Sequence, residues 1–145
     1  MSKKSMDRCL EEVFKDMEIR KKIDYGNMCS VRQCNRASDR IRKNFLYIDR
    51  HYPDKIHVIE QMLFHPDPEV ASDVAVVMQD FVNATVEQKW KAIDVVKGLL
   101  RNESLHWTSA IFLSRVWLRK AEAKLLDQQC QRDGLGAEEK NQEDV

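Results

Sequence analysis

Apolar residues recur along most of the chain at intervals of three and four, the spacing that places side chains on one face of an α-helix. This pattern predicts a series of consecutive amphipathic helices. The predicted helices, with the apolar residues that each should bury, are a first ending near residues 24–27 (Met6, Leu10, Val13, Met17), a second over about 29–50 (Cys34, Ile41, Phe45, Ile48), a third over about 53–64 (Ile56, Ile59, Leu63), a fourth over about 68–82 (Val70, Val74, Val77, Phe81) and a fifth over about 86–101 (Trp90, Ile93, Leu100).

A sixth helix is predicted after Ser104, which can cap its N-terminus. Trp107, Ile111 and Leu118 should lie on one side of it, with Phe112 and Val116 on another. A helix that is apolar over most of its circumference is usually buried, so a central position is expected. Beyond residue 126 almost no apolar residue follows, and the segment 127–145 is predicted to be an acidic, disordered tail to a single domain, 1–126.

Few residues interrupt these helices, because the chain has only four glycines and three prolines. The fold class predicted is therefore all-α, with about five to six antiparallel helices. The stretch HPDPEV, residues 65–70, is interpreted as a corner between two helices: Pro66 ends one, Asp67 caps the next, and Pro68 occupies its first turn. His65 has no part in this corner, which leaves a functional role for it open.

The corner recurs, since Val70 and Leu105 hold matching positions 35 residues apart and Leu63 and Leu100 match at 37. Helix pairs repeating at this period are typical of α-solenoids. The stretch 55–120 resembles HEAT-like repeats, and in particular short uncharacterised bacterial proteins with an HPDP-and-valine corner and a tryptophan near basic residues, here Trp117 beside Arg119 and Lys120. The resemblance implies a short HEAT-like α-solenoid. Ala71 stands where HEAT repeats commonly carry arginine, so the ion pair between stacked repeats is not expected there.

Charge is balanced overall but segregated along the chain. Lysine plus arginine and aspartate plus glutamate both number 24. The first 50 residues are net basic, whereas residues 51–104 are net acidic. On the fourth predicted helix an acidic stripe with one apolar member is expected, and two further carboxylates lie in successive corners near the same edge. These candidate partner-binding residues are Glu69, Asp73, Val76 and Asp80 on the stripe and Asp67 and Glu103 in the corners.

Catalytic and metal-binding patterns are weak in comparison. The histidines at 51, 57, 65 and 106 are scattered over different elements, and Cys29 and Cys34 are the only closely spaced cysteines. Zinc sites need closely spaced ligand pairs, and phosphate cradles need glycine. A buried packing role is therefore favoured for the cysteines, and we expect no metal, no cofactor, no catalytic residue and no enzymatic activity.

The charge pattern and the repeat together favour a protein-binding role. An acidic groove suits a basic partner, and proteins of the HEAT-like build occur among bacterial immunity proteins. The most specific hypothesis is an immunity protein or antitoxin that neutralises a basic toxin (nuclease) domain. A general helical-repeat adaptor and a small HEAT-like nucleic-acid-binding protein, using the basic residues of the second and sixth helices, are the alternatives. The start of the chain lacks a signal peptide and no stretch is apolar enough to span a membrane, so a cytoplasmic protein is expected.

Overall fold

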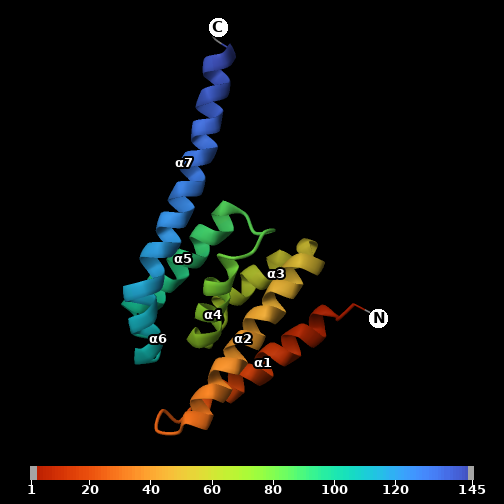
Figure 1. The fold of residues 1–145 in the computed structure, drawn as a ribbon, viewed down its shortest axis with the longest axis vertical. Coiled ribbons are helices and arrows are strands. Elements are labelled where there is room, and N and C mark those ends of the chain that lie inside the picture. Colours follow the sequence, from red (N-terminus) through yellow and green to blue (C-terminus); the bar gives the residue numbers. More distant parts are fainter. Residues whose placement is uncertain (1–2, 144–145) are drawn as a thin grey trace.

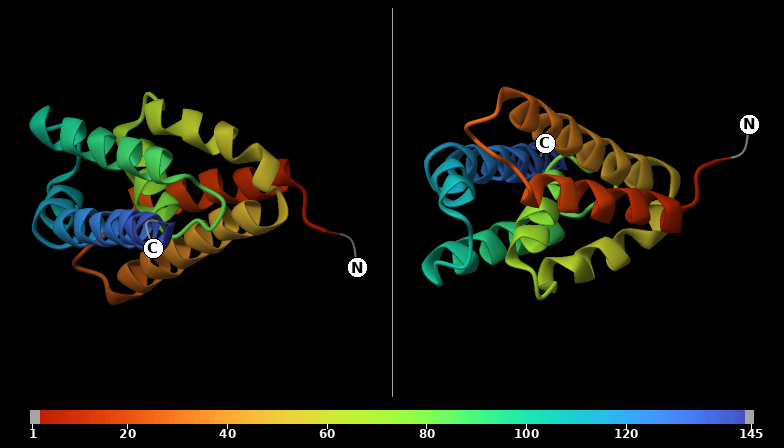
Figure 2. Two further views of the ribbon diagram at one scale, coloured as in Figure 1. Left: turned by 90° about the horizontal axis from the view of Figure 1, so that it is seen from above. Right: turned by 90° about the horizontal axis from the view of Figure 1, so that it is seen from below.

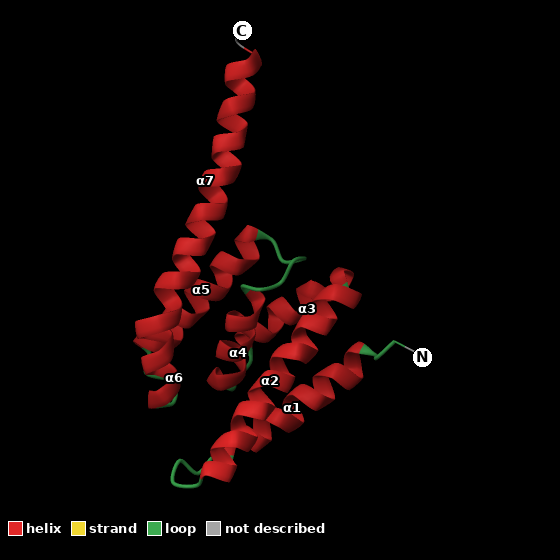
Figure 3. Cartoon of the chain, in the orientation of Figure 1, coloured by secondary structure: helices red, strands yellow, loops and turns green. Residues whose placement is uncertain are grey.

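The protein is helical along its described length (Figures 1 and 3). The computed structural model describes residues 3–143, with side chains as far as residue 131. Within this range there is no β-strand, which confirms the predicted all-α class. The elements are α1 (Met6–Lys21), α2 (Met28–His51), a 3₁₀ turn (Pro53–Lys55), α3 (Ile56–Gln61), a second 3₁₀ turn (Met62–Phe64), α4 (Pro68–Met78), α5 (Val86–Arg101), α6 (Trp107–Phe112), a π-helical turn (Leu113–Trp117) and α7 (Leu118–Glu143). None of the helices in the described range is long and apolar enough to cross a membrane.

Three helix pairings hold the structure together. α1 packs along α2, α4 packs along α5, and α5 in turn packs along α7 (Figures 1 and 2). The main core lies among α1, α2, α3, α4 and α5, with Phe45, Phe81 and Met78 among its largest fully buried side chains. A second, smaller cluster of Ile93, Ala121 and Leu125 fixes α7 to α5. α7 then continues beyond the other helices (Figure 1).

Several predicted boundaries agree with the structure. α5 spans Val86–Arg101 as predicted, and Thr85 and Gln88 form a reciprocal capping box at its start. The predicted inward stripe of the fourth helix, Val70, Val74, Val77 and Phe81, is buried throughout. Sequence periodicity therefore identified the core-facing side of this helix correctly.

Other boundaries differ for local reasons. α4 ends at Met78 rather than near residue 82, because the chain turns there and the backbone N–H groups of Val82 and Asn83 bind the carboxylate of Asp49. The predicted third helix is α-helical only over Ile56–Gln61, and a 3₁₀ turn forms each of its ends. Such tighter turns preserve the inward apolar positions, and Ile56, Ile59 and Leu63 are all buried.

The last predicted helix differs most. Its N-cap is His106 rather than Ser104, and the helix is divided by the π-helical turn before it continues as α7. α7 also includes residues 127–143, for which the sequence predicts a disordered tail. Leu125 is the last buried side chain in the range with described side chains, so packing against the other helices ends close to the predicted boundary at residue 126.

Glu103, in the corner between α5 and α6, has a backbone conformation that is unfavourable for a residue with a Cβ atom. Glu103 has φ of 53° and follows α5 in a turn closed by two hydrogen bonds, Ser104 N–H to the Leu99 carbonyl (3.1 Å) and Glu103 N–H to the Leu100 carbonyl (3.3 Å). Glycine is the residue favoured in this left-handed position. We therefore expect Glu103→Gly to raise the free energy of unfolding by about 1 kcal/mol, measured by urea denaturation.

The matched control for this substitution is Glu103→Ala, which removes the same carboxylate and keeps the unfavourable φ for a residue with a Cβ. It should not stabilise the protein. An equal gain from alanine and glycine would show that the carboxylate, rather than the backbone, is the cause.

Candidate binding groove

A groove with a volume of about 620 Å³ lies where α2, α4 and α6 come together. Because α4 lies between α2 and α6 in Figure 1, we call the α4 residues of the lining the floor of the groove and those of α2 and α6 its walls. The residues that line the groove are Arg20 of α1, Asn35, Ser38, Asp39, Ile41 and Arg42 of α2, Ser72, Asp73, Val76 and Val77 of α4, and Thr108, Ser109, Phe112 and Leu113 of α6 and the π-helical turn. Two of the predicted site residues, Asp73 and Val76, are therefore in it.

A second pocket, with a volume of about 580 Å³, adjoins the groove and shares five lining residues with it: Arg20, Ser38, Asp73, Thr108 and Ser109. It extends toward the N-terminus of α4, where Asp67 and Glu69 line it, and toward Tyr25 in the loop between α1 and α2. The predicted acidic stripe is thus divided: Glu69 lines the second pocket, Val76 lines the groove, Asp73 lines both, and Asp80 lines neither.

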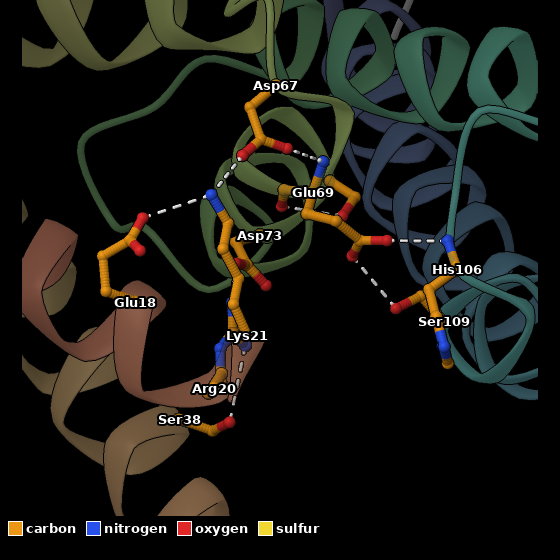
Figure 4. A network of polar contacts seen from close by, with 10 residues as sticks. Glu18, Arg20, Lys21, Ser38, Asp67, Glu69, Asp73, His106 and Ser109 are labelled. Atoms are coloured by element: carbon orange, nitrogen blue, oxygen red, sulfur yellow. Dashed lines mark hydrogen bonds and ion pairs between the residues drawn. The ribbon is translucent and has the colours of Figure 1, made fainter. Parts of the chain in front are cut away.

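Asp67 acts as a helix cap and as an ion-pair partner (Figure 4). One carboxylate oxygen accepts the Glu69 N–H at 3.0 Å, and the other lies 3.0 Å from the Nζ of Lys21 on α1. Burial opposes ionisation, but the hydrogen bonds from Lys21 and from the Glu69 N–H prevail and hold the pKa of Asp67 below its usual value. The corner interpretation of HPDPEV is confirmed, and His65 also takes part, since its Nδ1 accepts the Asp67 N–H at 3.0 Å.

Glu69 joins α4 to α6. Its carboxylate accepts the His106 N–H at 2.7 Å and the Ser109 hydroxyl at 3.1 Å, across the corner before α6 (Figure 4). The backbone N–H groups at a helix start are otherwise unsatisfied, so a carboxylate from a neighbouring helix stabilises the start of α6. Glu69 therefore positions α6 against α4.

Asp73 forms an ion pair with Arg20 of α1, which also reaches Ser38 of α2 (Figure 4). Burial raises the pKa of the Asp73 carboxyl, and the adjoining Arg20 guanidinium opposes that shift without cancelling it. The Nε of Arg20 is buried without a hydrogen-bond partner among the described residues. This pair holds the end of α1 onto α4 rather than presenting a free carboxylate.

The remaining predicted residues have separate environments. Asp80 lies 2.6 Å from the Nη1 of Arg42 on α2 and 3.8 Å from the Nζ of Lys124 on α7. Val76 is half-buried against the core, and Glu103 lies exposed in its corner, outside both pockets. The structure therefore brings Asp67, Glu69 and Asp73 together, but it engages these carboxylates and Asp80 with groups of the same chain.

The apolar surface next to the groove was not predicted. Trp107, Ile111, Phe112 and Val116 are 65%, 45%, 50% and 44% exposed, on α6 and the π-helical turn that follows it. The prediction that this helix is central is wrong, because α6 lies at the edge of the molecule (Figure 1) and buries little beyond Leu113 on its own turns. The sequence did indicate that this helix is apolar on most sides. A helix of this kind can be buried, as predicted, or can leave one apolar face exposed to solvent, as α6 does.

Other reactive side chains are dispersed. No group of three histidine, cysteine or carboxylate side chains in the described part of the chain is arranged to hold a metal ion. All four cysteines are free thiols, and only Cys9 is fully buried, whereas Cys29 and Cys130 are exposed. The predicted packing role therefore fails for Cys29 and Cys130.

Comparison with protein families, with curated proteins and with solved structures gave no match for this chain. The resemblance to HEAT-like bacterial proteins consequently remains a prediction from the sequence.

Proposed function

We propose that this chain is a protein-binding module whose contact surface combines the exposed apolar residues of α6 with the adjoining groove. The supporting observation is that four large apolar side chains within ten consecutive residues, Trp107, Ile111, Phe112 and Val116, are 44–65% exposed. A concentration of exposed large apolar side chains is a mark of binding surfaces. Aromatic residues such as Trp107 and Phe112 are also those that most often dominate binding energy.

The order of helices around the groove supports a helical-repeat arrangement for this module. In chain order α2, α4 and α6 are every second helix, and all three line the groove, whereas the helices that pack along each other are α1 with α2, α4 with α5 and α5 with α7. In α-solenoids, one helix of each pair lines a continuous concave binding surface. A short HEAT-like solenoid that binds its partner on the concave side would have this arrangement.

An immunity protein or antitoxin is one kind of protein-binding module. The hypothesis of a basic toxin as partner depends on free carboxylates on α4. Asp73 and Asp80 already pair with Arg20 and Arg42, and Asp67 pairs with Lys21, so a basic partner would have to displace these cations. We therefore propose that the chain binds a protein through the α6 surface. A general adaptor is the least specific function that fits this proposal.

The proposal is tested by co-purification from the native host with three forms of the full chain. Wild type and Val82→Ser should retain the same partner at a constant ratio, because Val82 is 81% exposed in the loop after α4, away from the groove. The double variant Trp107→Ser with Phe112→Ser should reduce retention at least roughly tenfold, the loss expected from removing two aromatic contacts.

Thermal unfolding checks that both serine variants remain folded, which is expected since the replaced side chains are largely exposed. Retention that is equal for all three forms would contradict the proposal. So would a partner lost equally from the Val82→Ser control.

A further inference from the structure

Exposed cations flank the groove on both sides. On α2 they are Arg32, Arg36 and Lys43, and on the α6 side they are Arg115, Arg119 and Lys120, all exposed. None of these six forms an ion pair with a carboxylate in the part of the chain whose side chains are described. Arg40 and Lys124, which the sequence places in the same two groups, do pair with Asp16 and Asp80.

These cations lie close to the residues that line the groove. Arg32 precedes the wall residue Asn35 by three positions and Lys43 follows Asp39 by four, so each is a surface neighbour of a lining residue on α2. Arg115 and Arg119 follow Phe112 on the opposite wall, three and seven residues along the same helical segment. The groove, with its apolar residues Val76 and Phe112, therefore has basic residues on both margins.

The carboxylates within the groove do not balance this charge. Asp73 is paired with Arg20, and Asp80, just beyond the groove, is paired with Arg42. The one lining carboxylate without an ion pair among the described side chains is Asp39. Among the charged side chains without an ion pair, the cations on the margins therefore outnumber the single carboxylate of Asp39.

We infer that the partner is an acidic amphipathic helix, whose apolar face lies on Phe112 and Val76 and whose carboxylates meet the basic margins. This inference rests on the proposed function and specifies its partner. An amphipathic helix laid into an apolar groove is a common mode of peptide recognition, and complementary charge at the margin increases the rate and specificity of binding. Nucleic acid fits less well, because phosphates need unpaired cations along the contact, and the cations within the groove, Arg20 and Arg42, already have partners.

The test is a selection of displayed helical peptides on the full chain. The library keeps an apolar stripe at i, i+3, i+4 and i+7 and randomises the flanking positions between acidic, basic and neutral residues. Enriched peptides should be net acidic, and their binding, measured by fluorescence anisotropy, should weaken with added salt. Binding to the variant Arg115→Glu with Arg119→Glu should be at least roughly tenfold weaker, whereas Val82→Ser should bind as wild type does.

The outcomes separate the two proposals. If the selected peptides bind the Phe112→Ser variant of the protein more weakly but carry mostly neutral or basic flanking residues, the inference of an acidic partner would be overturned. The groove would still be the binding site. Failure to enrich any peptide whose binding depends on Phe112 would count against the proposed function itself. A labelled 20-nucleotide RNA is measured in parallel, and RNA that binds more tightly than every selected peptide, with the same dependence on Arg115 and Arg119, would overturn the inference in favour of nucleic acid.

Discussion

Replacing Asp49 with alanine is expected to lower the free energy of unfolding by about 3 kcal/mol. The buried carboxylate of Asp49 on α2 accepts two backbone hydrogen bonds from the turn after α4, from Val82 N–H at 2.8 Å and from Asn83 N–H at 3.0 Å. The Asn83 amide also donates to the Asp49 carbonyl at 2.8 Å. Alanine leaves the two backbone donors without their charged acceptor, and each such bond contributes about 1.5 kcal/mol or more.

Urea denaturation monitored by tryptophan fluorescence measures this loss. Asp54→Ala is the matched control, because Asp54 is an exposed aspartate in the 3₁₀ turn that follows α2, and it should change stability by less than about 0.5 kcal/mol. Asp49→Asn, which retains one acceptor oxygen, should fall between the two. If Asp49→Ala is no less stable than Asp54→Ala, the carboxylate does not hold the turn in solution.

Asp49 also illustrates why the sequence predicts helices better than the contacts between them. The stripes of α2, α4 and α5 follow from a local period of the chain, and so do the caps at Asp67 and Thr85, because each depends on residues a few positions apart. Asp49 and Val82 are 33 residues apart, and no local pattern relates them. The end of α4 was consequently placed several residues too late.

Only part of the candidate site was predicted, because its contacts also join residues that are far apart in the sequence. Periodicity placed Asp73 and Val76 on a face of α4 that does line a groove, but it gave no information about which cations lie opposite. Arg20 is 53 residues from Asp73, so the ion pair depends on the tertiary arrangement. The exposed face of α6 was missed because an apolar helix surface more often indicates burial within the chain than a surface left for a partner.

Reversing the charge of Asp73 is expected to destabilise the fold by about 3 kcal/mol, because Asp73→Lys would place a second cation beside the partly buried guanidinium of Arg20. The Asp73 side chain is 21% exposed, so water can compensate only part of this cost. Asp94→Lys on α5 is the control, since Asp94 is exposed and a charge reversal there should change stability by less than about 0.5 kcal/mol. Equal unfolding midpoints in urea for the two variants would show that the pair between α1 and α4 contributes little.

The double variant Arg20→Met with Asp73→Leu is expected to recover most of the stability that Asp73→Lys loses, because it removes both charges and the cost of burying them. Its pH dependence gives an independent check. The pKa of Asp73 is raised in the folded protein, so the folded state holds this proton more tightly than the unfolded chain does. The stabilisation that results is complete below pH of about 3.9, the unfolded value, and is lost as pH rises through the folded-state pKa. Wild type should therefore lose stability relative to the double variant as pH rises from about 3.9 through the folded-state pKa of Asp73, and a difference that stays constant or changes in the opposite direction would contradict the assigned environment of Asp73.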